Sequence, residues 1–306
     1  MNRPVDWDDQ RAFLAVLEEG SLSGAARRMG VAQPTVRARI AALEHALGTV
    51  LFTRSVRGLV PTGQARALGA SARAMDRASE AFVRAASAAP GEPAGIVRLS
   101  VSEFVGIEVL PPMLGKLREH HPGLIVELAL SNAPANLLEQ EVDIAVRMSA
   151  PRQEALVAQK AASIPLGLFA HVDYLARRGE PDTPGDLARH DLIGPDRALA
   201  DFERAATLFP DLDRGRFVVR TDSHPAQLAA VRAGLGIAVV QLPVGLADAR
   251  LRPILPELKI GKLDSWIVMH ENLRELPRVR AVFDHLVGAF RQFARAGDGR
   301  KPRPDR

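Results

Sequence analysis

Apolar positions in the first fifty residues recur at helical spacing and predict three short helices. These helices span Trp7–Glu19, Leu22–Met29 and Gln33–Leu47. The side chains expected to face inward are Trp7, Phe13, Leu14 and Leu17 in the first helix, and Val36, Ile40, Leu43 and Leu47 in the third. The first helix is expected to pack behind the other two.

The second and third helices form a pair with distinct start and stop signals. Ser21 can accept a hydrogen bond from a free first-turn N–H, and Gly30 tolerates the left-handed conformation of a tight helix exit. Pro34 suits the first turn of the third helix, where a missing N–H costs nothing. Two short helices joined by a short apolar turn describe a helix-turn-helix.

Polar residues gather at the start of the third helix, where a helix-turn-helix meets the bases of DNA. Arginine can pair with guanine and glutamine with adenine in the major groove. The candidate DNA-binding residues are Ser21, Gln33, Pro34, Thr35, Arg37, Ala38 and Arg39. The alternative is an ordinary pair of amphipathic helices with a solvated arginine face.

Two short strands are predicted next, at Val50–Phe52 and Leu59–Pro61. With the segment between them they would form a β-wing that carries Arg54 and Arg57 at its tip. Both arginines are candidates for contact with DNA, and the alternative for Arg54 is a surface arginine without a partner.

A long helix is predicted from the possible cap Thr62 to about residue 89. Apolar and small residues follow each other along it at alternating spacings of three and four, the pattern of a coiled-coil seam. They are Ala65, Leu68, Ala72, Met75, Ser79, Phe82 and Ala86. We expect Leu68, Ala72, Met75 and Phe82 to mediate dimerisation, and the alternative is a helix packed on its own domain.

After a Pro- and Gly-rich linker at residues 90–95, strands and helices alternate. Strands are predicted at Ile96–Val101, Leu124–Leu130, Val142–Val146, Ile164–Ala170, Phe217–Arg220, Ile237–Gln241 and Trp266–His270. Helices are predicted at Leu110–Glu119, Leu137–Glu141, Pro225–Ala233 and Pro277–Ala294, the last with Val279, Val282, Phe283, Leu286 and Phe290 inward. The alternation predicts an α/β fold, and the order of the first three strands with their helices predicts a parallel sheet covered on both faces.

Polar side chains stand where these strands end, which is where ligands bind in open α/β sheets. They are Ser100, Ser102, Glu103, Ser131, Asn132, Arg147 and Met148 in the first half, and Thr221, Asp222 and Ser223 in the second. Hydroxyls, helix N-termini and Arg147 would suit a small carboxylate, with Phe202 as an apolar wall. The alternatives are helix caps for the hydroxyls and a salt bridge from Arg147 to Asp143 or Glu103.

Charge separates the two parts of the chain. Residues 20–60 contain six arginines and one acid, Glu44, whereas residues 90–290 contain 22 basic and 26 acidic residues. The positive charge thus lies on the helix-turn-helix, where phosphate contacts need it. The basic tail, with Arg291, Arg295, Arg300, Lys301, Arg303 and Arg306, is interpreted as a solvated, frayed end.

Several chemistries find no support in the sequence. It contains no cysteine, which excludes disulfides and thiolate metal sites, and its eight histidines lack metal-ligand spacing. The neighbours Asp222, Ser223 and His224 are expected to form a strand-to-helix turn, and residues 234–236 a helix-to-strand turn. We therefore expect no enzyme activity, no metal and no cofactor. An acidic N-terminus and the lack of a long apolar run predict a cytoplasmic protein without a membrane span.

The segments Phe13–Arg54 and Gly58–Ala65 resemble the LysR-type transcriptional regulators in residue order and spacing, and the resemblance extends from about Asp6 to Phe293. Two positions differ from the usual family pattern, because Ala32 stands where a capping serine is common, and Arg37 and Ala38 stand where Ser-Arg is common. The base-reading arginine is therefore Arg37 or Arg39. In this family the wing arginine, here Arg54, touches DNA.

The resemblance implies an N-terminal winged helix-turn-helix at residues 1–62, a coiled-coil dimerisation helix at 63–89 and an effector-binding domain at 90–306. That domain would have two α/β lobes, about 95–164 with 267–295 and about 165–266, and would resemble type 2 periplasmic binding proteins. The implied partners are double-stranded DNA with an interrupted palindrome near a promoter, a small-molecule effector, further copies of the chain in a dimer or tetramer, and RNA polymerase as a candidate. The alternative is a ligand-independent architectural DNA-binding protein.

Overall fold

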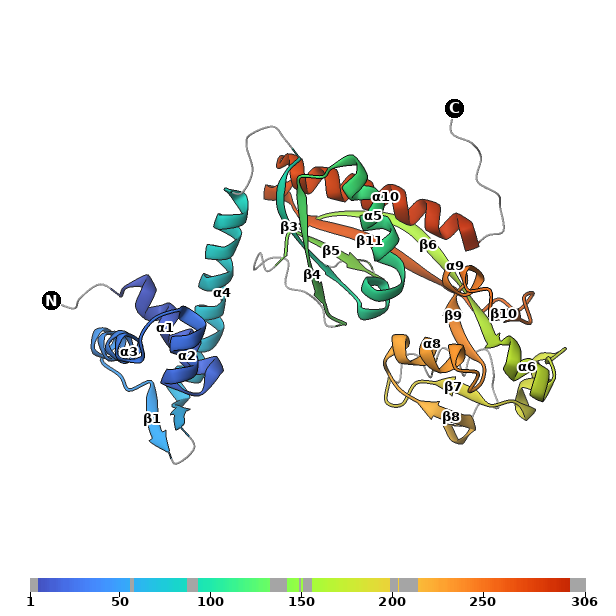
Figure 1. Cartoon of the computed structure of the whole chain (residues 1–306), viewed down its shortest axis with the longest axis horizontal. Helices are drawn as coiled ribbons and strands as arrows, with labels where there is room; N and C mark the ends of the chain where they lie inside the picture. Colours follow the sequence, from blue (N-terminus) through green and yellow to red (C-terminus); the bar gives the residue numbers. More distant parts are fainter. Residues whose placement is uncertain are drawn as a thin grey trace. The chain divides into compact units, whose positions relative to one another are not determined.

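The computed structural model describes residues 5–55, 58–86, 93–132, 142–148, 150, 156–198, 203 and 214–297. The chain divides into two compact units, one up to Ala86 and one that contains the remaining described residues. Figure 1 colours the first unit from blue to cyan and the second from teal to red.

The first unit contains α1 (Trp7–Glu19), α2 (Leu22–Met29) and α3 (Gln33–Leu47), which confirms all three predicted helices. The Ser21 hydroxyl accepts a hydrogen bond from the Gly24 N–H at 3.1 Å, and Gly30 ends α2 with a φ of 65°. One hydrophobic core joins these helices, and its buried members include Phe13, Leu14, Val16, Val36, Leu43 and Leu51.

The prediction that Leu47 faces inward is wrong. Its side chain is 41% exposed, whereas Ala46 and the predicted Val36, Ile40 and Leu43 are buried. Leu47 occupies the last turn of α3 before Gly48. Helical spacing marks a stripe along a helix, but it does not show how far the neighbouring elements cover that stripe.

The wing consists of β1 (Phe52–Ser55) and β2 (Gly58–Pro61), which pair antiparallel. Its first strand starts and ends later than predicted, so Val50 is outside it and Arg54 lies within it, opposite Leu59. The Glu44 carboxylate of α3 accepts hydrogen bonds from the N–H groups of Leu51 and Phe52 at 2.7 and 3.2 Å. The acid in this basic region thereby connects the wing to α3.

The long helix α4 spans Gly63–Ala85 and is capped by Thr62, whose hydroxyl accepts a hydrogen bond from the Ala65 N–H at 3.2 Å. Its apolar stripe divides into two parts. Ala65 and Ala72 are buried in the core of the first unit and Leu68 packs against that core, so here the helix packs on its own domain. Further along, Met75 is 43% and Phe82 is 77% exposed.

The second unit is built on one mixed sheet with the strand order β10-β6-β11-β5-β3-β4, in which β9 also pairs with β6. Its strands are β3 (Gly95–Val101), β4 (Leu124–Leu130), β5 (Ile144–Arg147), β6 (Leu156–His171), β9 (Ala238–Gln241), β10 (Leu251–Ile254) and β11 (Lys262–His270). As predicted, β3 is parallel to β4 and to β5. The other pairs are antiparallel.

The long strand β6 divides this sheet into two lobes. Residues 156–165 of β6 pair with β11, whereas residues 166–171 pair with β9 and β10. We call the part with β3, β4, β5 and β11 the first lobe and the part with β9 and β10 the second lobe. A small parallel sheet, β7 (Leu192–Gly194) with β8 (Phe217–Arg220), joins the second lobe through a bridge from Leu192 to Ile237.

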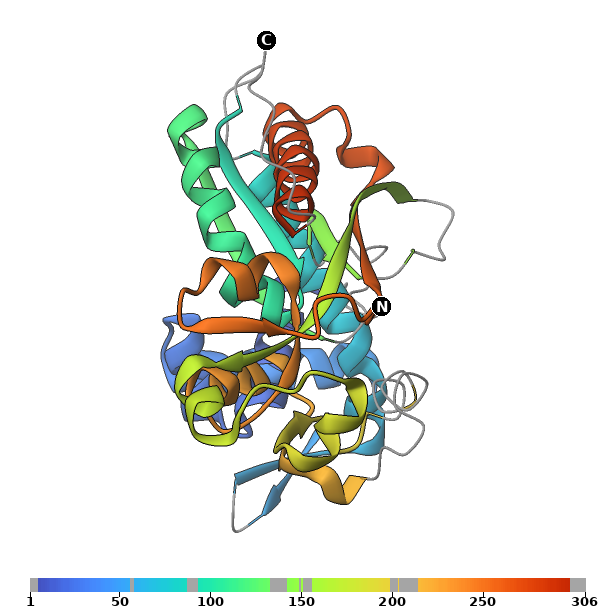
Figure 2. The same cartoon turned by 90° about the vertical axis from the view of Figure 1, so that its right-hand side faces the viewer.

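Helices cover the sheet as the alternation predicts. The first lobe carries η1 (Val105–Val109, a π-helix), α5 (Leu110–His120) and α10 (Pro277–Gly297), and the second carries α6 (Val172–Arg178), α8 (His224–Arg232) and α9 (Leu242–Ala247). Short 3₁₀ turns occupy η3 (Pro184–Arg189), η4 (Arg214–Arg216) and η5 (Glu271–Leu273). Figures 1 and 2 show α5 and α10 side by side, and both helices contribute to the same core. All five predicted inward residues of α10 are buried.

Some elements differ from the prediction. Both β6 and β11 begin earlier than predicted. Their first halves carry polar residues and lack a clear alternation, so the sequence pattern did not indicate a strand there. The short elements α6, β7, α9 and β10 have no counterpart among the predicted ones. In β10, Pro253 would argue against a strand, but β10 lies at the edge of the sheet, where proline is tolerated.

Some predicted features lie outside the described residues. They are the helix Leu137–Glu141, Arg57, Phe202, the end of the long helix beyond Ala86 and the tail from residue 298. Within the described part of the chain, no helix is long and apolar enough to span a membrane.

Candidate DNA-binding surface and effector site

The first turns of α3 present the predicted polar residues to solvent. Gln33, Pro34, Thr35, Arg37 and Ala38 are all exposed, and buried Val36 anchors the turn from behind. Ala32 occupies the N-cap position and makes no side-chain hydrogen bond. The N-terminal end of α3 is therefore an open, polar surface.

The two candidate arginines of α3 differ in their surroundings. Arg39 Nη1 lies 2.9 Å from Asp8 Oδ2 of α1, and its side chain is 25% exposed. Arg37 is exposed and has no hydrogen-bond or carboxylate partner among the described residues. The ion pair ties Arg39 to the body of the unit, whereas Arg37 has no such tie among the described residues.

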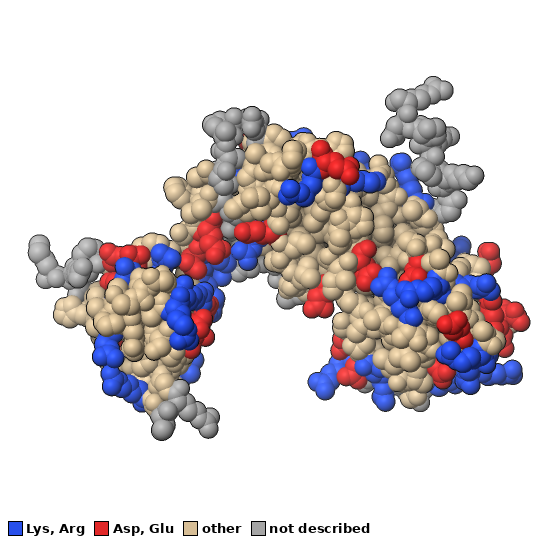
Figure 3. Space-filling view, viewed as in Figure 1, with Lys and Arg blue, Asp and Glu red and all other residues tan. Residues whose placement is uncertain are grey.

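Other arginines of the first unit have different tasks. Arg28 forms an ion pair with Glu18, and the hydrogen bond to this carboxylate is the main cause that raises the pKa of Arg28. Arg54 projects from β1 as an exposed side chain. Figure 3 shows basic side chains on several parts of the surface of this unit, with acidic side chains beside some of them, and a mixture of both kinds on the second unit.

The carboxyl end of β5 meets the carboxyl end of β3 through Arg147. Its Nη1 donates to the carbonyl oxygens of Ser100 and Val146 at 3.0 and 2.8 Å, and its Nη2 donates to the Ser100 hydroxyl at 2.8 Å. Ser100 is 2% exposed, so this contact is well enclosed. Two of the predicted residues are thus in direct contact.

One edge of the Arg147 guanidinium has no partner among the described residues. Within that part of the chain three of its five N–H groups are used, and those left are the Nε–H and one Nη2–H, which together form the edge that binds a carboxylate with two hydrogen bonds. Neither Asp143 nor Glu103 forms an ion pair with Arg147 in the described chain, so the alternative of a salt bridge from Arg147 to one of them is not supported. Burial lowers the pKa of Arg147, because desolvation disfavours its charged form.

The other predicted residues of the first lobe surround this edge of the sheet. The Asn132 side-chain oxygen accepts a hydrogen bond from the Glu103 N–H at 3.2 Å, and the Ser131 N–H donates to the Val101 carbonyl at 2.9 Å. These bonds connect the end of β4 to the turn after β3. Ser102, Glu103 and Met148 are half-buried at the same strand ends.

The second lobe brings its three predicted residues to the end of β8. The Asp222 carboxylate accepts hydrogen bonds from the N–H groups of Asp196, Arg197 and Ala198, and those from Ala198 and Arg197 are the main causes that lower the pKa of Asp222. This carboxylate therefore serves mainly to hold the loop at 196–198. The Thr221 hydroxyl accepts from the Ser223 N–H at 3.2 Å, which orders the turn into α8.

An ion-pair cluster, which the sequence analysis missed, joins the two lobes. Arg232 of α8 donates to both carboxylate oxygens of Glu108 in η1, at 2.9 and 2.8 Å, and to Asp248 at 3.1 Å. Arg250 also contacts Asp248, and its hydrogen bonds come first among the causes that lower the Asp248 pKa to about 2. Glu108 lies 124 positions and Asp248 lies 16 positions from Arg232 along the chain, so no local sequence pattern reveals the cluster.

No group of three or more His, Cys, Asp or Glu side chains suited to a metal ion occurs in the described part of the chain. Asp222, Ser223 and His224 form a strand-to-helix turn, as predicted. Gly234, with a φ of 71°, forms the turn before β9.

Comparison with known proteins assigns both units. Residues 7–66 match the profile of the bacterial regulatory helix-turn-helix protein, lysR family, and residues 90–291 match the LysR substrate binding domain. An HTH-type transcriptional regulator of Xanthomonas campestris pv. campestris strain 8004 is 30% identical over 291 residues, which cover 92% of this chain and 85% of that protein.

Solved structures share the fold. The crystal structure of CbnR, a LysR family transcriptional regulator, matches with a TM-score of 0.69 and 21% identity over 94% of this chain and 99% of CbnR. Full-length CbnR in complex with its target DNA matches with a TM-score of 0.67 and 22% identity over 93% of this chain and 99% of that chain.

A winged helix-turn-helix joined to a two-lobed α/β substrate-binding domain defines a class of DNA-binding transcriptional regulators. The chain belongs to the LysR family of this class.

Proposed function

We propose that this regulator binds an interrupted palindrome near a promoter as a dimer or a tetramer. A single recognition helix reads few base pairs, and two copies placed about one helical turn apart read enough for useful specificity. CbnR has been crystallised with its target DNA, and the first unit of this chain has the same fold. Arg37, together with Gln33 and Thr35, contacts base edges, whereas Arg54 of the wing contacts the phosphates.

The dimer forms through the second half of α4. Met75 and Phe82 lie seven residues apart on one face of this helix and are exposed, although large apolar side chains are normally buried. Leu68 and Ala72, the other members of the expected seam, are already used by the core of the first unit.

The regulator responds to a small carboxylate bound at the carboxyl ends of β3, β4 and β5. The observation that carries this proposal is Arg147, an enclosed guanidinium with no carboxylate partner in the described chain and with its two-donor edge unused. Ser102 and Asn132 supply further polar groups from the first lobe, and Thr221 and Ser223 from the second. The effector changes DNA binding because it binds one arrangement of the oligomer better than another.

The experiment is a binding assay with the DNA next to the protein's own gene, a salt titration and a panel of small carboxylates. Sequence-specific binding with a steep salt dependence, altered by one carboxylate, is the expected result. Salt-sensitive binding that ignores both sequence and every compound would instead favour the architectural DNA-binding protein.

A further inference from the structure

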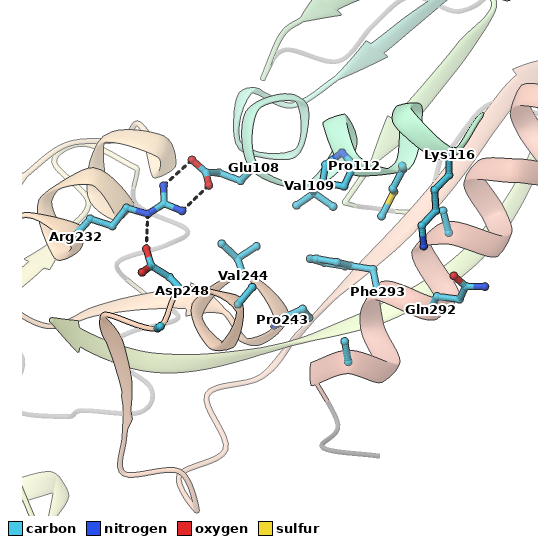
Figure 4. Close-up of a pocket in the computed structure, with 15 residues that line it drawn as sticks. Glu108, Val109, Pro112, Lys116, Arg232, Pro243, Val244, Asp248, Gln292 and Phe293 are labelled. Atoms are coloured by element: carbon cyan, nitrogen blue, oxygen red, sulfur yellow. Dashed lines mark hydrogen bonds and ion pairs between the residues drawn. The ribbon is translucent and has the colours of Figure 1, made fainter. Parts of the chain in front are cut away.

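A pocket of about 620 Å³ lies next to α10, at the place where the two lobes meet. It is apart from the proposed effector site at the carboxyl ends of β3, β4 and β5, which we call the strand-end site. Its walls come from η1 and α5 of the first lobe, from α9 and Arg232 of the second, and from the C-terminal half of α10. This volume is within the range of about 300–1,000 Å³ that is usual for small-molecule sites. Figure 4 shows the side chains that line it.

The middle of the pocket is apolar. Val109 and Met113 from the first lobe, Pro243 and Val244 from the second, and the half-buried ring of Phe293 form this surface. An apolar ligand group placed there would remove both its own surface and that of the pocket from water, which favours binding.

The two ends of the pocket differ in charge. At one end, Glu108 and Asp248 are both engaged by Arg232, and Asp248 also by Arg250, so the charges there balance. At the other end stand Lys116 of α5 and Gln292 of α10, as Figure 4 shows. Among the described residues neither the Lys116 ammonium nor the Gln292 amide has a hydrogen-bond or ion-pair partner.

We propose that this pocket is a second ligand site, and that it binds a small amphipathic monocarboxylate. The carboxylate of the ligand accepts hydrogen bonds from Lys116 and Gln292, and its hydrocarbon part lies against Phe293 and Val244. One unpaired cation at one end of an apolar groove fits a monoanion with an extended apolar part. It fits a dianion or a sugar poorly, because the apolar walls offer them no partners.

Such a ligand would touch both lobes at once. Glu108, Met113 and Lys116 belong to the first lobe, and Val244 and Asp248 to the second. A ligand that contacts both walls stabilises the arrangement in which both are present, beside the ion pairs of Arg232 that join the same elements.

The test measures binding of octanoate and of its neutral analogue octanamide to the full-length protein by calorimetry. The wild type is expected to bind octanoate about fivefold more tightly than octanamide, the size of a partly exposed ion pair. Lys116→Gln should abolish this preference without affecting folding, because Lys116 is exposed on a helix and glutamine is a good helix former.

A second variant blocks the groove directly. Ala296→Glu places a carboxylate at an exposed position of the pocket wall and should weaken octanoate binding at least about tenfold through repulsion and steric block. Lys259→Gln, which removes an exposed lysine outside the pocket, is the matched control and should leave binding unchanged.

Arg147→Gln distinguishes binding in the pocket from binding at the strand-end site. This variant should still bind octanoate, and should still bind it more tightly than octanamide. The inference is wrong if Lys116→Gln and Ala296→Glu both bind octanoate like the wild type. It is equally wrong if Arg147→Gln alone abolishes binding, or if the wild type binds no octanoate up to about 10 mM.

Discussion

Arg39 of α3 and Asp8 of α1 form an ion pair with 2.9 Å between Nη1 and Oδ2. The pair joins the recognition helix to the helix behind it. Its consequence concerns Arg37, two residues earlier on α3, which remains exposed. An arginine that is paired with a carboxylate must break that ion pair to contact DNA, whereas an unpaired arginine loses only side-chain conformational entropy.

The first prediction separates these two arginines. Arg37→Ala should weaken specific operator binding by about 1–3 kcal/mol, the value of a lost bidentate base contact. Arg39→Ala should weaken it by less than 1 kcal/mol, because its main partner is Asp8. Fluorescence anisotropy with labelled operator and with scrambled DNA measures both variants.

Asp8→Ala is the control for this pair, since it frees Arg39 without touching the recognition surface. Operator affinity should then stay equal or rise slightly. If Arg39→Ala proved the more damaging substitution, Arg39 would be the base-reading residue and the ion pair would break on binding.

The sequence was sufficient to predict the elements whose signals are local. Helix α2 has its cap and its left-handed glycine within ten residues, and β4 and β8 are bounded as predicted because each is a short β-branched or apolar run between polar turns. The residues at the carboxyl ends of β3 and β5 could be named in advance for the same reason, because a parallel sheet aligns such ends.

Relationships between distant segments could not be predicted. The ion pair of Arg232 with Glu108 spans 124 positions, and the contact of Arg147 with Ser100 spans 47. The sequence shows that these residues are charged or polar, but their partners depend on how the lobes pack. The division of the α4 stripe has the same cause, because the periodicity of Ala65 and Phe82 is identical while only one of them is covered.

A second prediction concerns the effector response. Arg147→Lys keeps the charge but loses the two-donor edge, so it should weaken binding of the active carboxylate about tenfold to a hundredfold. DNA affinity without effector should stay within about twofold, because Arg147 lies in the other unit. Titration of the effector into the protein–DNA complex measures the first, and binding without effector the second.

Arg147 also holds two backbone carbonyls, so a loss of response needs a check on folding. Lysine can still reach one of them, and the melting temperature of Arg147→Lys should remain close to that of the wild type. A full effector response in this variant, with unchanged affinity, would show that Arg147 serves the fold alone.

A third prediction follows from Asp248, whose pKa is lowered to about 2 by Arg250 and Arg232. A carboxylate whose pKa is lowered by folding stabilises the folded state at every pH above its pKa in the unfolded chain, which is near 4. This stabilisation is lost as the pH falls from about 4 to about 2, the pKa in the folded state. The shift corresponds to about 2–2.5 kcal/mol. Urea unfolding of wild type and Asp248→Asn from pH 7 to pH 2.5 should show a stability difference that shrinks in this window.

Exposed Glu257, which has no partner in the described chain, supplies the comparison for Asp248. Glu257→Gln should differ from the wild type by less than about 0.5 kcal/mol at every pH. A difference for Asp248→Asn that stays constant through pH 3 would mean that the carboxylate is not paired in solution.

A fourth prediction tests the exposed half of α4. Phe82→Glu should shift the protein from dimer or tetramer towards monomer, because a buried unpaired charge would replace a large apolar contact in the seam. Sedimentation velocity over a range of protein concentrations measures the change. Ala70→Glu, an exposed position on another face of the same helix, should leave the assembly unchanged. Equal behaviour of the two variants would exclude this face of α4 as the interface.

The fifth prediction concerns the start of the recognition helix, where Ala32 is the N-cap and makes no side-chain hydrogen bond. Its backbone already has the extended conformation of a capping residue, with φ −72° and ψ 146°. The Thr35 N–H now donates to the Ala32 carbonyl at 3.0 Å. In Ala32→Ser the new hydroxyl can accept from the same N–H, as capping hydroxyls do, which should stabilise the first unit by about 0.5–1 kcal/mol. Ser21→Ala, which removes the existing bond to Gly24, should destabilise it by a similar amount. Trp266 of the second unit also fluoresces, so both substitutions are made in a chain that carries Trp266→Phe and keeps Trp7 as its one tryptophan. Urea unfolding followed by Trp7 fluorescence then measures both, and opposite shifts of similar size would show that α3 lacks a cap that its backbone is ready to use.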